Sequence, residues 1–100
     1  MYARVTSGQL HPDKIDEATR MYQESIVPAL KHARGFKSLL ALTAHATGKG
    51  LVIALWETEA EMQASQTSGL YQEQLVKMAH LLVGMPSVDT YEVTVNIKNT

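Results

Sequence analysis

Three aromatic side chains, Tyr22, Trp56 and Tyr71, are the residues best suited to form a binding site in this 100-residue chain. Each lies on the apolar side of a segment that we expect to pack between a sheet and its helices, so the three could converge on one cavity. Two methionines, Met62 and Met78, would add adaptable and polarisable walls to it. Together these side chains would suit a small hydrophobic or aromatic molecule.

Two small residues sit beside the only tryptophan. Because side chains alternate along a strand, Val52 and Ala54 share a face with Trp56. A large ring with small neighbours either packs against a bulky helix residue or leaves room for a ligand. The aromatic residues could therefore equally be ordinary members of the hydrophobic core.

One histidine is a candidate for acid–base chemistry. His45 lies near the end of a predicted strand, where it could reach a pocket mouth, and an imidazole that titrates near neutral pH suits a general base. The chain has no cysteine. Its four histidines lack the short paired spacings of zinc or iron ligands; they are His11, His32, His45 and His80. We therefore expect no metal site.

The first half of the chain predicts a strand and a long helix. Residues 2–10 form the strand, which His11 and Pro12 stop, and proline suits the first turn of the helix that follows. Apolar side chains then recur at helical spacing on one face: Ile15, Ala18, Tyr22, Ile26 and Ala29. We expect Pro28 to kink this helix and Gly35 to end it.

The second half predicts a hairpin, a broken helix and a last strand. Residues 36–46 and 51–56 flank a glycine-containing turn, which is typical of a β-hairpin. Thr58 and Glu61 have the spacing of a capping box, so a helix should begin just after Trp56. That helix should break at Ser68 and Gly69 and resume until Gly84, and residues 88–97 alternate as the final strand.

This order, βαββαβ, predicts an α+β fold of the ferredoxin-like type: a four-stranded antiparallel sheet with both helices on one face. The central strands, residues 39–42 and 51–56, are apolar on both faces, as in strands that are covered on both sides. The chain has no further element to cover the second face. A homodimer formed through that sheet face is therefore expected, and residues 1–100 should form a single domain.

Charge and hydropathy exclude several classes of partner. The net charge of −1 gives no basic surface for nucleic acid or an anionic membrane. No apolar stretch approaches the roughly 20 residues that span a bilayer. Arg4 and Ser7 interrupt the N-terminus where a signal peptide would be apolar, so we expect a cytoplasmic protein.

The hairpin and the helix start resemble a known family. The stretch "ALWETEAEMQAS" at residues 54–65, with "GF" before the second strand and "YEV" in the last, resembles the antibiotic biosynthesis monooxygenase (ABM) domain over nearly the whole chain. The resemblance implies a dimeric α+β barrel. Members of that family include oxygenases of polycyclic phenols, quinol monooxygenases and heme-degrading enzymes, and fold alone does not decide among them.

The heme-degrading branch can be tested at three positions. Its members have an asparagine on the first strand, a tryptophan in the second helical region and a histidine further along. Counting from the shared strand tryptophan places these positions at Ala3, Ser65 and Leu75. None of the three residue types is present, which argues against heme degradation.

The resemblance then implies a cofactor-independent monooxygenase that acts on a small phenol or quinol. An electron-rich phenol that is deprotonated in a dry pocket can itself give an electron to oxygen, so the protein supplies desolvation, orientation and a proton acceptor. Two alternatives stay open: a non-catalytic, regulatory small-molecule binder on the same barrel, and an isomerase or lyase of the same fold.

Overall fold

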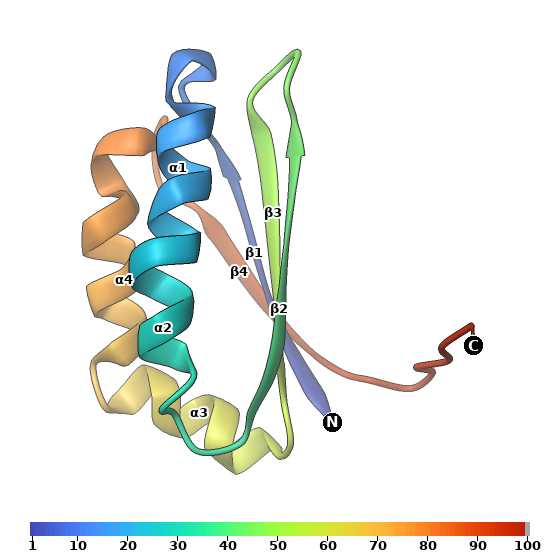
Figure 1. Ribbon diagram of the computed structural model, residues 1–100. Coiled ribbons are helices and arrows are strands. Elements are labelled where there is room, and N and C mark those ends of the chain that lie inside the picture. The colour runs from blue at the N-terminus through green and yellow to red at the C-terminus, as the bar shows by residue number, and fades with distance from the viewer. Residues whose placement is uncertain (100) are drawn as a thin grey trace.

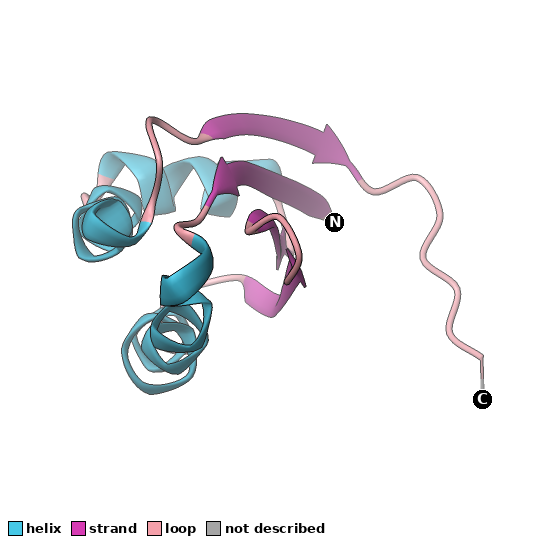
Figure 2. Ribbon diagram, turned by 90° about the horizontal axis from the view of Figure 1, so that it is seen from above, coloured by secondary structure: helices cyan, strands magenta, loops and turns pink. Residues whose placement is uncertain are grey.

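The chain alternates strands and helices in the predicted βαββαβ order. The computed structural model describes residues 1–99. Its strands are β1 (Tyr2–Gln9), β2 (Phe36–Ala44), β3 (Lys49–Trp56) and β4 (Ser87–Glu92), and its helices are α1 (Ile15–Met21), α2 (Val27–Leu30), α3 (Glu59–Thr67) and α4 (Leu70–Met78). The helices form one layer against one face of the sheet (Figures 1 and 2). The expectation of an α+β, ferredoxin-like fold is confirmed.

The sheet has the strand order β2-β3-β1-β4, and every neighbouring pair is antiparallel. Its register lines up residues in rows across the strands. Arg4, Ala54 and Leu39 form one row on the face that the helices cover. Because side chains alternate along a strand, the adjoining row of Val5, Ile53 and Leu40 points to the opposite, outer face.

The long first helix changes its winding before Pro28. Residues Tyr22–Ile26 form a π-helical segment between α1 and α2, and the N–H of Val27 donates to the carbonyl of Tyr22, five residues back. A proline has no N–H and its ring crowds the preceding turn, so a widened turn relieves the clash. The predicted kink is therefore a π segment just N-terminal to Pro28. The helix also ends at Leu30, earlier than Gly35.

The capping box places the start of α3. Thr58 has an extended backbone, and its Oγ1 accepts from the N–H of Glu61 at 3.1 Å. The Glu61 carboxylate accepts the hydroxyl proton of Thr58 at 3.0 Å. Gly69, with a left-handed φ of 89°, separates α3 from α4 where the sequence predicted the break.

The last strand is shorter than expected. β4 ends at Glu92, whereas the alternating pattern predicted a strand as far as residue 97. The reason lies in its neighbour: β1 begins at Tyr2, and the final ladder bond runs from the N–H of Val93 to the carbonyl of Met1. Residues 93–99 therefore run past the end of β1 and leave the sheet on the side away from the helices (Figure 2).

The hydrophobic core lies between the inner sheet face and the helices. Its fully buried side chains are Ile26, Leu30, Trp56, Met62 and Leu81. Trp56 meets Phe36 edge to face, with ring centroids 5.6 Å apart. Across residues 1–99, none of the helices combines the length and apolar character that crossing a membrane requires.

Candidate functional site

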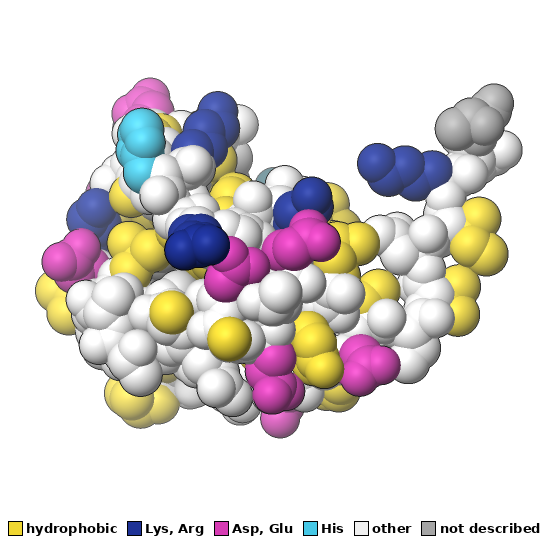
Figure 3. All heavy atoms as spheres, turned by 90° about the horizontal axis from the view of Figure 1, so that it is seen from below, with side chains coloured by type: hydrophobic (Ala, Val, Ile, Leu, Met, Phe, Trp, Pro, Cys, Tyr) yellow, Lys and Arg dark blue, Asp and Glu magenta, His cyan; other side chains and the backbone are white. Residues whose placement is uncertain are grey.

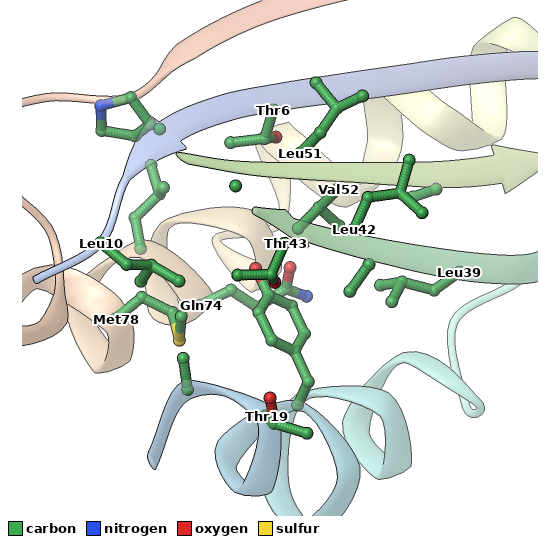
Figure 4. Close-up of a pocket in the computed structure, with 18 of the residues that line it drawn as sticks. Thr6, Leu10, Thr19, Leu39, Leu42, Thr43, Leu51, Val52, Gln74 and Met78 are labelled. Atoms are coloured by element: carbon green, nitrogen blue, oxygen red, sulfur yellow. The ribbon is translucent and has the colours of Figure 1, made fainter. Parts of the chain in front are cut away.

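A cavity of about 380 Å³ opens between the inner sheet face and helices α1 and α4. This volume lies within the range of small-molecule sites. Figure 4 shows side chains from three directions around it: Thr6 and Val52 from the sheet, Thr19 from α1, and Gln74 and Met78 from α4. The cavity is therefore built by elements that are far apart in the sequence.

Small residues on the sheet make this space. The row of Gly8, Gly50 and Thr43 and the row of Thr6, Val52 and Ala41 both line the cavity. The next row contributes Ala54, whereas the row after it carries the large rings of Trp56 and Phe36. The side chains on the inner face of β3 are thus small from Gly50 to Ala54 and large at Trp56, and the aromatic end closes the cavity.

Arg4 is the only charged residue that lines the cavity within the described chain. Its side chain is 3% exposed. Nη1 donates to the Ser65 hydroxyl at 2.8 Å and to the Met62 carbonyl at 3.4 Å. The guanidinium carbon lies 4.3 Å from the Tyr71 ring centroid and 5.5 Å from that of Trp56, so two aromatic faces flank the cation. Burial lowers the pKa of Arg4 from its ordinary value.

Two tyrosines bring hydroxyl groups to the same space. The hydroxyls of Tyr71 and Thr6 are hydrogen-bonded at 3.2 Å. Burial, with a smaller contribution from Tyr71, raises the pKa of Tyr22 to about 12. Tyr22 therefore keeps its proton at neutral pH and acts there as a hydrogen-bond donor or acceptor rather than as a base.

Gln74 supplies a donor without a partner. Its Nε2 atom is buried and makes no hydrogen bond with any residue of the described chain. The side chain reaches from α4 into the cavity (Figure 4). A buried amide that lacks a partner is costly, so an acceptor on a ligand would satisfy it.

Five of the seven residues expected to form a pocket line this cavity: Tyr22, Val52, Ala54, Tyr71 and Met78. The other two, Trp56 and Met62, lie behind it in the packed core. Trp56 is separated from the cavity by the row of Ala54 and by Arg4. His45, expected near a pocket mouth, is exposed in the turn between β2 and β3 and is not part of the lining.

Sequence reasoning missed Arg4 and Gln74. For Arg4 the pattern carried an indication: Tyr2, Arg4, Thr6 and Leu10 have the same parity in the first strand, and Leu10 is a core residue. A charged residue on the core side of a strand is unusual. No comparable indication existed for Gln74, which lies one residue before the predicted apolar position Leu75.

The heme-branch positions occupy three different environments. Ala3 follows the alternation of β1 onto the outer face, whereas Ser65 contacts Arg4 and Leu75 lines the cavity. The described lining includes no histidine, so it offers no imidazole ligand for heme iron. Within residues 1–99, no group of three His, Cys, Asp or Glu side chains is arranged to hold a metal ion.

The fold is shared with solved structures at low sequence identity. A monooxygenase from the gene ActVA-Orf6 of Streptomyces coelicolor, solved with the ligand nanaomycin D, matches with a TM-score of 0.80 and 14% identity over 99% of this chain and 92% of that one. MhuD, a heme degrader of Mycobacterium tuberculosis with two hemes in its active site, matches with a TM-score of 0.75 and 14% identity over 98% and 100%.

A third match, a protein of Nitrosomonas europaea provisionally named an antibiotic biosynthesis monooxygenase, has a TM-score of 0.75 and 11% identity over 95% of this chain and 100% of that one. No protein-family model and no curated protein sequence matches the chain. The structural likeness agrees with the resemblance at residues 54–65, and the chain has the fold of the antibiotic biosynthesis monooxygenases.

Proposed function

We propose that the protein is a cofactor-independent monooxygenase that acts on a small aromatic phenol or quinol. The observation that carries the proposal is the cavity of about 380 Å³, which combines an apolar lining with a few polar groups inside a fold that monooxygenases share. Such a mixture fixes the orientation of a planar ligand while it excludes water.

The reaction balances without an external reductant. A phenol that reacts with one O₂ gives a quinone and one water: one oxygen atom joins the ring carbon opposite the hydroxyl, and the other leaves as water. The phenol supplies all four electrons. Its anion first gives an electron to oxygen; the ring–peroxide adduct that follows then loses the ring proton and hydroxide.

The chain's own residues would position the substrate in this scheme. Val52 and Ala54 offer a flat floor on the sheet, and Met78 and Tyr71 close the opposite side. The tyrosine and glutamine groups can hydrogen-bond the substrate oxygens. Exclusion of water protects the peroxide adduct and strengthens these polar contacts.

Oxygen uptake tests the proposal. Protein treated with a chelator is mixed with 1-naphthol in an oxygen electrode, and the rate is compared with that of protein-free buffer. Protein-dependent uptake is expected, and Val52→Phe, which fills the cavity floor, should abolish it. Uptake that survives in Val52→Phe, or none with wild-type protein, would contradict the proposal.

The alternative functions differ in what the cavity must contain. An isomerase or lyase needs a positioned acid–base pair, yet no Asp, Glu, His or Lys belongs to the described lining. A non-catalytic binder needs only affinity, and the donor-rich lining is compatible with one. Tight binding of a naphthol without oxygen uptake would therefore favour the binder.

We further propose that one domain, residues 1–100, pairs with a second copy through the outer sheet face. Leu40 is 54% exposed there, and Ile53 and Leu55 lie beside it on the same face. The C-terminal tail, residues 93–99, lies opposite these residues with a gap between them. Asn96 and Lys98 line the tail side of this gap. Figure 3 shows the tail as an arm that stands clear of the body.

The tail itself has the pattern of a strand without a partner. Val95 and Ile97 are 72% and 86% exposed and alternate with polar residues. A second copy in the gap would cover the outer face and offer these side chains a surface. Burial of both apolar surfaces would stabilise the pair.

A further inference from the structure

The charge of Arg4 has no counter-ion in the described chain. No carboxylate lies within ion-pair distance of its guanidinium; the ion pairs of residues 1–99 are Arg34–Glu61, Lys37–Glu57 and His80–Glu17. Both side-chain hydrogen bonds of Arg4 come from Nη1 and end on neutral oxygens. A buried charge is costly unless it is paired, so this cation, placed at a cavity wall, is set to receive an anion.

Its neighbours do not replace that anion. The Ser65 hydroxyl, which accepts from Arg4, donates its own proton to the Met62 carbonyl at 2.6 Å. The Tyr71 and Trp56 rings attract the cation through their π-electrons, which is a weaker compensation than an ionic partner. These contacts hold the guanidinium in one position beside the cavity.

The other polar groups around the cavity also favour an anionic ligand. Gln74 presents an unpartnered amide donor, and Tyr22 and Tyr71 present hydroxyl groups. The raised pKa of Tyr22 keeps its hydroxyl protonated. The titratable groups of the described lining are thus Arg4, Tyr22 and Tyr71, and this lining includes no acidic side chain that would repel an oxyanion.

We propose that the cavity binds its aromatic ligand as the oxyanion, a phenolate or enolate, with Arg4 as the counter-charge and Gln74 as a further donor. This inference deepens the proposed function and rests on it, because it names the ionic form of the same ligand class. It also explains how the site works without a general base: the phenol gives its proton to bulk solvent before it enters the cavity, and Arg4 stabilises the bound anion, which lowers the apparent pKa of the phenol.

The probe is 4-nitrophenol, whose absorbance reports its ionisation directly, with its methyl ether 4-nitroanisole as the neutral analogue. Wild-type protein should bind the phenol at least tenfold more tightly than the ether above the phenol's pKa. The bound phenol should turn yellow at least one pH unit lower than the free phenol, which corresponds to a tenfold preference for the anion. The inference would be overturned if the protein bound phenol and ether with equal affinity, or if the bound phenol turned yellow at the same pH as the free phenol or at a higher one.

Variants place the effect on Arg4. Arg4→Met should abolish the tenfold preference, Arg4→Lys should retain part of it, and the exposed control Arg20→Met should leave it unchanged. If Arg4→Met does not fold, the wild-type comparison of phenol and ether still decides. The probe test is separate from oxygen uptake: an anion preference without uptake overturns the oxygenase alone, and uptake without a preference overturns this inference alone.

Discussion

The guanidinium carbon of Arg4 lies 4.3 Å from the centre of the Tyr71 ring, and this contact joins the first strand to the last long helix across the cavity wall. The Tyr71 hydroxyl continues the connection to Thr6, two residues along β1 from Arg4. One tyrosine thus holds the cavity's cation with its ring and the strand with its hydroxyl, which couples the stability of the wall to the chemistry of the site.

The two parts of Tyr71 should be separable by mutation. Tyr71→Phe removes one partly buried hydrogen bond and keeps the ring, so it should lower the free energy of unfolding by about 1 kcal/mol. Tyr71→Leu also removes the ring from a desolvated cation and should cost about 2 kcal/mol more. Urea unfolding followed by circular dichroism measures both; equal losses would show that the ring adds nothing.

Trp56 should behave as a core residue. It is fully buried and packs on Phe36, so Trp56→Ala should lower the free energy of unfolding by about 3–5 kcal/mol. Trp56→Phe should cost clearly less and leave ligand affinity within a factor of about two, because the indole lies behind the lining. Loss of binding in a well-folded Trp56→Phe protein would instead make the indole part of the binding surface.

Ionisation of Tyr22 should lower the free energy of unfolding at alkaline pH. Its pKa is raised from 10.0 to about 12 in the folded protein, so the folded state favours the neutral form. This contribution is fully present below pH 10 and is lost as the pH rises from 10 to 12, by at most about 2–3 kcal/mol. Tyr22→Phe should show a shallower decline in that window than wild type in pH-dependent urea unfolding.

If the stability of Tyr22→Phe falls as steeply as that of the wild type, the hydroxyl of Tyr22 is no more difficult to ionise in the folded state than in the unfolded state, which would contradict this prediction.

The outer sheet face should control assembly. Light scattering after size exclusion should give twice the 11.0 kDa chain mass for the wild type. Leu40→Lys and Ile53→Lys place a charge in the proposed interface and should give monomers at micromolar concentration. The matched control Val76→Lys changes a residue that is 76% exposed on α4 and should stay dimeric; a monomeric wild type would refute the dimer.

Local patterns predicted the fold because each depends on neighbouring residues alone. The alternation of β3 placed Val52, Ala54 and Trp56 on one face, and the Thr58 cap placed the helix start. The position of Trp56 behind the cavity, in contrast, depends on the packing of Arg4 and Ala54 between the indole and the cavity. That arrangement is tertiary and has no counterpart in one segment of sequence.

The same distinction explains the other differences. The pattern of residues 93–97 is that of a strand, but a strand needs a neighbour and β1 has ended there. His45 was placed near a pocket by its position at a strand end, whereas the turn carries it into solvent. Gln74 became a site residue only because the packing of α4 turns its amide inward.

The central claim is that this cavity lets a phenol react with oxygen without a cofactor, and isotope labelling tests it most directly. Chelator-treated protein is incubated with 1-naphthol under ¹⁸O₂, and the quinone product is analysed by mass spectrometry. The account predicts one ¹⁸O atom per product molecule, with the unlabelled phenol oxygen retained and formation abolished in Val52→Phe. A product without ¹⁸O, or no product from a protein that binds the naphthol, would contradict it.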